Sequence, residues 1–322
     1  YECTPLLSIK NKKLVTPRRL GCITSKSHGN MTQQNPFSRK FDSQKDNQLI
    51  KKAITGNRQA LNELLQRHNN FIYNIAIKML ANIEDAKDVT QDILIKVVTN
   101  LAKYDVNKAQ FRTWLYRITF NYILNYKKSN TEKNIVSFQH FFEFMENVED
   151  DHSIMDDEAV DQLSEEMKLK CMSGMLMCIP REDRLLYIMG DLFKIDHHLG
   201  AEVFEISKVN FRKRLSRTRN QLRQWMDNKC GLVHKSNPCR CAKKTKGFIK
   251  RGIVDPESLV WDKAFTSRIN TYTEENLQDA LKSSDMIYSK LYREHPFKEN
   301  NKTKEIIEEI LSDKNFAEIL NL

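Results

Sequence analysis

The stretch from Asp85 to Lys128 reads DAKDVTQDILIKVVTNLAKYDVNKAQFRTWLYRITFNYILNYKK, and its pattern decides the fold class. Apolar side chains recur every three or four positions, which predicts an amphipathic helix from about Glu84 to Lys103. Its apolar stripe consists of Ala86, Val89, Ile93, Val97 and Leu101. A short polar loop from Asp105 to Gln110 leads into a second predicted helix, from Phe111 to about Lys128. Two helices with a short connection indicate a packed helical domain.

Helical periodicity extends on both sides of this stretch. Apolar residues recur in the same way from Ile50 to Met79, so we expect one helical domain at 41–130. Residues 141–166 carry eleven Asp or Glu and no Lys or Arg, so 131–170 is predicted to be an acidic linker. A second helical domain is predicted at 171–228, and a Cys-containing basic segment with C-terminal helices at 229–322. The predicted fold class is all-α, with two helical domains, an acidic linker and a small helical extension.

The composition favours a cytoplasmic protein of more than one domain. A chain of 322 residues, 40% of them hydrophobic, can bury two or three cores. It has no apolar run of transmembrane length, so no membrane is expected among its partners. Seven scattered cysteines do not indicate the disulfide framework of a secreted protein. We expect residues 1–40 to be a disordered leader or sequence upstream of the natural start, because Tyr1 cannot be a start residue.

The positive charge is concentrated in one predicted helix. The net charge is +10, and Lys208 to Arg223 contains seven Lys or Arg and no acidic residue. Such a block indicates phosphate binding, although a solvated helix face would look similar. A short helix around Leu199 to Phe204, a turn at Glu205-Ile206 and a long helix capped by Ser207 predict a helix-turn-helix. A non-glycine residue in a left-handed turn, as Glu205 would be here, costs on the order of 1 kcal/mol of stability.

Two separated segments resemble RNA polymerase sigma factors of the extracytoplasmic-function (ECF) type. DAKDVTQDILIKV with FRTWLYRITFNYILNYKK resembles their region two. IPREDRLLYIMGDL, from Ile179 to Leu192, with EISKVNFRKRLSRTRNQL, from Glu205 to Leu222, resembles region four. The resemblance implies a non-catalytic factor that binds core RNA polymerase, recognises promoter DNA and promotes its opening. It also allows an anti-sigma factor as a partner.

The resemblance implies a polymerase-binding face on the first helix of the quoted stretch. Residues Asp85, Asp88 and Asp92 share one side of this helix, opposite its apolar stripe, with Gln91 beside them. Ordinary complementation of the helix dipole would explain Asp85 but not Asp92. We therefore expect Asp85, Asp88, Gln91 and Asp92 to bind core polymerase.

The following loop and helix are basic and aromatic, as single-strand binding requires. By resemblance they hold the melted minus-ten element. The expected contact residues are Lys103, Lys108, Gln110, Arg112, Trp114, Arg117, Asn121, Lys127 and Lys128. Trp114 could serve packing as well as base contact. Phe111, Leu115, Ile118 and Tyr122 are expected in the core because they repeat at helical spacing.

The basic helix of the helix-turn-helix is expected to read the minus-thirty-five element. Its periodic residues Phe211, Leu215, Thr218 and Leu222 should face the core. The residues left for DNA are Lys208, Asn210, Arg212, Lys213 and Arg217, of which the first four are nearest the N-terminal end that reaches base edges.

The segment from Cys230 to Pro256 resembles a C-terminal extension found in some sigma factors of this type. Cys230, His234, Cys239 and Cys241 offer enough soft ligands for a structural zinc ion, although their spacing is not that of a standard finger. Plain reduced cysteines are the alternative. Lys243, Lys244, Lys246 and Lys250 make this segment basic, which suggests extra contacts with promoter DNA or polymerase.

Two other classes of function were weighed. A stand-alone helix-turn-helix regulator would bind duplex operators as a dimer, but it would not need the acidic face or the FRTWLYRI helix. An enzyme is not indicated, because the sequence lacks a Gly-rich phosphate loop, an H-E-x-x-H motif and a deaminase signature.

Overall fold

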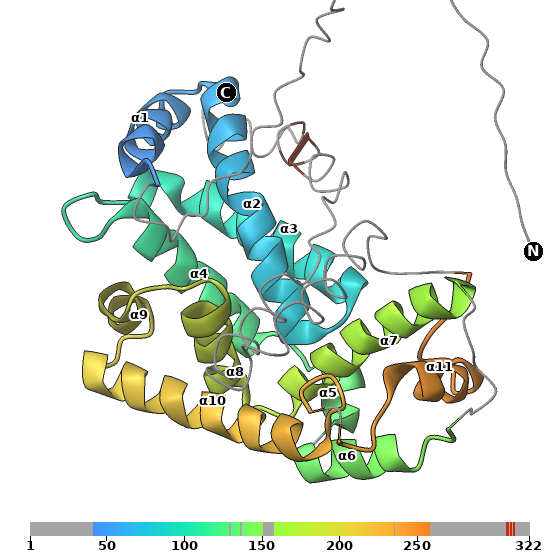
Figure 1. Ribbon diagram of the computed structural model, residues 1–322. Coiled ribbons are helices and arrows are strands. Elements are labelled where there is room, and N and C mark those ends of the chain that lie inside the picture. Colours follow the sequence, from blue (N-terminus) through green and yellow to red (C-terminus); the bar gives the residue numbers. More distant parts are fainter. Residues whose placement is uncertain are drawn as a thin grey trace, which may run out of the picture. The chain divides into compact units, whose positions relative to one another are not determined.

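The described part of the chain is built from helices (Figure 1). The computed structural model describes residues 41–257, except 129, 136, 151–157 and 235, together with 307, 308, 310 and 312. The expected leader at 1–40 and most of the expected C-terminal helices beyond 257 lie outside these residues. The elements are α1 (Ser43–Ile54), α2 (Arg58–Leu80), α3 (Ile83–Asn100), the 3-10 turn η1 (Leu101–Lys103), α4 (Phe111–Asn125), α5 (Asn130–Asn134), α6 (Phe138–Glu146), α7 (Glu158–Met177), α8 (Arg181–Tyr187), the π-turn η2 (Ile188–Leu192), α9 (His197–Val203), α10 (Lys208–Lys229) and α11 (Cys241–Lys250).

The all-α prediction is confirmed. Within the described residues, extended pairing is limited to an isolated bridge between Cys230 and Cys239. None of the described helices is long and apolar enough to span a membrane.

Helices α1 to α4 form the predicted N-terminal helical module. Each of the first three begins at a side-chain cap that accepts a backbone N–H: Asp42, Asn57 and Asn82. The stripe expected on α3 is buried, from Ala86 through Val97, and it packs against α2 and α4. These helices therefore follow the sequence periodicity closely.

The segment expected to be an acidic linker is largely helical. It contains α5, α6 and the first part of α7 among its described residues. The apolar face of α6 is buried through Phe138, Phe141, Phe142 and Met145, and two of these rings stack on Trp225 of α10. The acidic residues of α6, Glu143 and Glu146, are exposed, so the acidity of this helix does not prevent it from packing.

The two predicted modules share one apolar core. Phe120 of α4 lies 5.0 Å from Phe204, which follows α9, and Phe71 of α2 lies 5.8 Å from Phe193, between ring centroids. The buried apolar residues of both modules belong to a single cluster. The structure therefore brings together two modules that we expected to be held apart by a tether.

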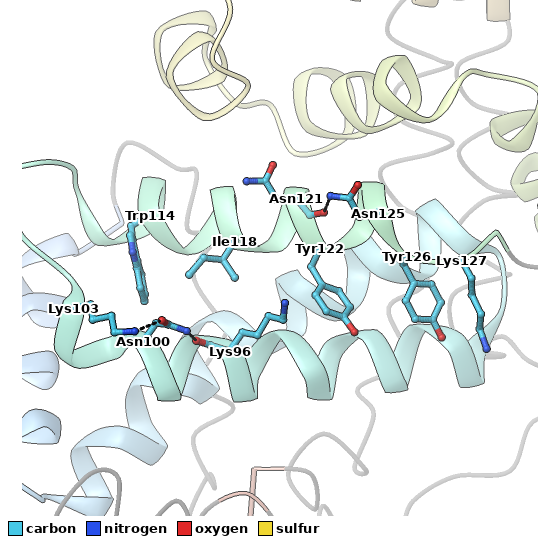
Figure 2. A pocket seen from close by; sticks show the side chains of 10 residues that line it. All are labelled: Lys96, Asn100, Lys103, Trp114, Ile118, Asn121, Tyr122, Asn125, Tyr126 and Lys127. Carbon is cyan, nitrogen blue, oxygen red and sulfur yellow. Dashed lines mark hydrogen bonds between the residues drawn. The ribbon is translucent and has the colours of Figure 1, made fainter.

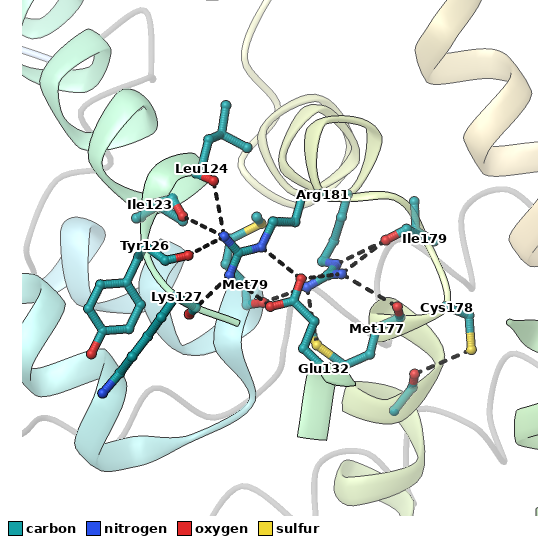
Figure 3. A network of polar contacts seen from close by, with 12 residues as sticks. Met79, Ile123, Leu124, Tyr126, Lys127, Glu132, Met177, Cys178, Ile179 and Arg181 are labelled. Carbon is teal, nitrogen blue, oxygen red and sulfur yellow. Dashed lines mark hydrogen bonds and ion pairs between the residues drawn. The ribbon is translucent and has the colours of Figure 1, made fainter. Parts of the chain in front are cut away.

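A buried polar network joins the modules (Figure 3). Arg184 of α8 is 2% exposed, and it donates to the Met79 carbonyl of α2 at 2.6 Å and to the Ile179 carbonyl after α7. Arg181 donates to carbonyls at the end of α4, including that of Leu124 at 3.0 Å. Glu132, 4% exposed, pairs with Arg181 at 2.7 Å and with Arg184 at 3.1 Å. Two arginines, which pair with one carboxylate, thus donate to the C-terminal carbonyls of three helices.

The predicted helix-turn-helix consists of α9, a turn at 204–207 and α10. Ser207 caps α10 by accepting the N–H of Asn210. Gly200 lies against Phe211, whose ring would be 2.6 Å from a Cβ at that position. Glu205 has φ of 55°, so the turn does place a non-glycine residue in the left-handed region, as expected.

Replacing Glu205 with glycine should raise the free energy of unfolding by up to about 1 kcal/mol, because glycine adopts this conformation without strain. The change also removes an exposed ion pair with Arg117 at 3.7 Å, but such a pair contributes little to the free energy of unfolding. Urea titration measures the difference. A less stable glycine variant would show that the ion pair outweighs the backbone strain.

Candidate nucleic-acid interface

A groove of about 830 Å³ lies between α3 and α4 (Figure 2). Trp114, Ile118, Tyr122 and Tyr126 line it from the α4 side, and their spacing of four places them on one face of the helix. The full lining consists of Lys96, Asn100, Lys103, Trp114, Ile118, Asn121, Tyr122, Asn125, Tyr126 and Lys127. Aromatic rings, amides and lysines thus share one concave surface.

The carboxylates of α3 fix the two tyrosine rings. The hydroxyl of Tyr122 donates to Asp92, and that of Tyr126 donates to Asp85 at 3.3 Å. Burial, together with the hydrogen bond and charge of Asp92, raises the pKa of Tyr122 well above its ordinary value of 10.0. Both hydroxyls therefore stay protonated donors at neutral pH.

Lysines lie over the same rings. Lys96 Nζ is 4.9 Å from the centroid of Tyr122, and Lys127 Nζ is 5.7 Å from that of Tyr126. Rings for base stacking beside cations for phosphate are what single-stranded nucleic acid requires.

The structure brings together four of the nine residues expected at the minus-ten element. Lys103, Trp114, Asn121 and Lys127 line the groove. Lys108, Gln110, Arg112 and Lys128 lie outside its lining, and Arg112 donates to Gln110 at 3.1 Å. The ring of Trp114 packs 5.6 Å from that of Phe111, and contact of Trp114 with a base stays a prediction.

Arg117 does not face this groove. Its guanidinium donates to the Glu202 carbonyl of α9 at 2.8 Å. Contact with the second module turns this side chain away from the groove lining, and minus-ten binding by Arg117 stays a prediction.

Sequence reasoning missed several groove residues. Tyr122 and Ile118 were expected in the core, yet both are only half-buried and line the groove. Lys96, Asn100 and Asn125 were not considered. The four-residue repeat that begins at Trp114 was the signal that could have identified the aromatic side, but the same spacing also fits a core stripe.

The acidic face of α3 is divided between two environments. Asp88 is exposed, whereas Asp85 and Asp92 are half-buried and hold the tyrosines. Gln91 is also half-buried. Polymerase binding by this face stays a prediction, and Asp88 is the carboxylate best placed for it.

The residues of α10 that are expected to bind DNA are exposed. These are Lys208, Asn210, Arg212, Lys213 and Arg217. Sequence reasoning overlooked Val209, which is 51% exposed among them and could contact a thymine methyl group. Arg214 and Arg219 instead pair with Asp183 and Asp191, at 2.7 and 2.8 Å.

The structure does not bring the expected zinc ligands together. Among the residues that the structure describes, no group of three or more His, Cys, Asp or Glu side chains is placed to hold a metal ion. His234 lies 3.4 Å from Asp227, while Cys230, Cys239 and Cys241 share a small cavity with Cys171 of α7. Burial raises the pKa of Cys230 to about 11. The zinc site stays an untested prediction.

Comparison with known proteins identifies the N-terminal helical module. The family model for sigma-70 region 2 matches residues 64–132, which include α3, α4 and the groove. ECF RNA polymerase sigma factor SigW of Bacillus subtilis is 33% identical over 72 residues, which are 22% of this chain and 38% of that protein. ECF RNA polymerase sigma factor SigE of Mycolicibacterium smegmatis is 24% identical over 176 residues, or 53% and 65% of the two chains.

A solved structure of CnrH in complex with the cytosolic domain of CnrY has a TM-score of 0.41 and 20% identity, over 57% of this chain and 97% of that one. The sequence matches, rather than this structural likeness, identify the domain. The chain spans between about a third and two thirds of the length of SigW and SigE. It contains a sigma-70 region 2 domain, and over this part of its length it is similar to ECF RNA polymerase sigma factors.

Proposed function

We propose that this protein is a transcription initiation factor that binds core RNA polymerase and promoter DNA and performs no covalent chemistry itself. The proposal rests on the groove between α3 and α4. There, carboxylates of α3 accept hydrogen bonds from two tyrosines, and lysines lie over the tyrosine rings. Unpaired bases of the minus-ten element would stack on these rings, and the lysines would meet phosphates.

The helix-turn-helix would supply the second contact with the promoter. The exposed N-terminal part of α10 has the residue types that recognise base edges in the major groove. The proposed factor would act in the cytoplasm, where polymerase and promoter are found. An anti-sigma partner stays a prediction.

Binding to core polymerase tests the proposal. Asp88→Lys should reduce co-purification with core polymerase strongly while leaving helical content unchanged, because the exposed carboxylate would meet a basic partner surface. Glu202→Lys, an equally drastic change at an exposed position of α9, is the matched control, because it lies outside the acidic segment. The full chain should also make promoter thymines reactive to permanganate when polymerase is present. A chain that neither binds polymerase nor opens promoters would refute the proposed function.

A further inference from the structure

The C-terminal extension forms hydrogen bonds with the backbone at the end of α6. Residues 144–150, here called the linker end, carry backbone carbonyls that the helix itself cannot satisfy. Lys244 of α11 donates to the Val148 carbonyl and, at 3.4 Å, to that of Glu146. Arg251, just after α11, donates to the Asn147 carbonyl at 2.7 Å. The extension therefore caps α6 with two cations, which also suits the negative end of the helix dipole.

The contact is close and partly buried. Lys244 is only 6% exposed. Gly247 of α11 faces Val148, and a Cβ there would lie 2.5 Å from the Val148 side chain and 3.0 Å from the Glu149 carbonyl. Phe248, 3% exposed, meets the ring of Phe144 edge-on at 6.1 Å. A glycine at this position allows α11 to lie directly on the linker backbone.

Each acidic side chain of the linker end has a cationic partner from the C-terminal side. Glu146 pairs with Lys229 at the end of α10. Glu149 pairs with Lys250 at 3.1 Å, and Asp150 pairs with Lys244 at 3.2 Å. Each of the exposed ion pairs contributes little to stability. The pair between Lys244 and Asp150 is largely shielded from water, so the attraction between its charges is stronger. Two of the lysines expected to reach DNA or polymerase thus bind this chain's own acidic residues.

We propose that α11 is an intramolecular clamp that competes with core polymerase for the acidic linker end. This inference rests on the proposed function, in which the factor binds core polymerase, and it takes the polymerase surface that meets the linker end to be basic, as the carboxylates there would favour. While α11 and Arg251 occupy the carboxylates of Glu149 and Asp150 and the carbonyls of residues 146–148, those groups are withheld from any other basic surface. Release of the clamp makes the linker end available, so the extension regulates how tightly the factor binds polymerase.

Two variants of the full chain test the clamp by different chemistry. Lys244→Met removes the charge and keeps the length of the side chain, whereas Gly247→Leu pushes α11 away by steric overlap. Lys246→Met is the matched control, because Lys246 is exposed on the same helix. Both test variants should speed hydrogen–deuterium exchange of amides at 144–150, with exchange in α2 and α3 unchanged. Both should also tighten binding of core polymerase by about fivefold or more, since apparent affinity scales with the fraction of competent molecules.

The outcomes separate the clamp from the proposed function. Unchanged exchange at 144–150 in both variants would show that α11 does not restrain the linker end. Faster exchange with unchanged or weaker polymerase binding would show that α11 does not compete with polymerase for the linker end. If the wild-type chain binds no polymerase, the proposed function fails, and the exchange comparison alone then decides whether the clamp exists.

Discussion

Replacing Glu132 with alanine should lower the free energy of unfolding by about 3–5 kcal/mol, because it leaves two buried arginines without their carboxylate. Arg184 is 2% exposed, and Arg181 is 14% exposed. Both would keep their carbonyl partners at the ends of α2, α4 and α7, but the charge between them would be uncompensated. Chemical denaturation monitored by circular dichroism gives the change. Glu84→Ala, which removes a surface ion pair with Lys87, should cost less than about 1 kcal/mol.

The carboxylate of Glu132 should make the free energy of unfolding depend on pH in the acidic range. Burial alone would raise the pKa of Glu132, but hydrogen bonds and charge from Arg181 and Arg184 outweigh burial and leave the pKa below its ordinary value of 4.5. A lowered pKa in the folded state stabilises the protein above pH 4.5, and this contribution disappears as pH falls through the folded-state pKa. The stability difference between wild type and Glu132→Ala should therefore shrink in that acidic range. A difference that stays constant below pH 4.5 would contradict the role assigned to this ion pair.

The sequence predicts local elements well here, and it predicts contacts between distant elements poorly. Periodicity identified α3, α4 and α10, because each buries a stripe with helical spacing. In the supposed linker, Phe138, Phe141, Phe142 and Met145 also have that spacing, but the surrounding acidic residues suggested an unpacked tether. The rings of Phe138 and Phe142 stack on Trp225, which lies more than eighty positions further along the chain, and no local pattern reveals this partner.

The candidate site shows the same division. Four expected minus-ten residues line the groove: Trp114 and Asn121 come from α4, Lys103 from η1, and Lys127 follows α4. Arg117 lies on the same helix and is a residue type that suits phosphate binding, but its side chain contacts the second module instead. The metal prediction depended on spacing within one segment, whereas the cysteines share their cavity with Cys171 of a different helix. Residue type and spacing limit what a side chain could do, and tertiary packing decides which way it points.

Replacing both Tyr122 and Tyr126 with alanine should weaken capture of a single-stranded minus-ten oligonucleotide by about 1–3 kcal/mol for each base stack that is lost. Both rings line the groove, and lysines lie over them. Fluorescence anisotropy of a labelled strand, with core polymerase present, measures the loss. Duplex binding through α10 should be unchanged, because those residues lie on another element.

Two control variants assign that loss to the groove rings. Tyr122→Phe keeps the ring and removes only the hydroxyl that donates to Asp92, so it should bind the strand nearly as well as wild type. Arg117→Ala should also bind normally, since its guanidinium contacts Glu202 rather than the groove. The reverse pattern, with normal binding by the double tyrosine variant and weak binding by Arg117→Ala, would place the melted strand on the α9 side of α4. That position would require the two modules to separate before the strand could bind, because Arg117 now contacts the second module.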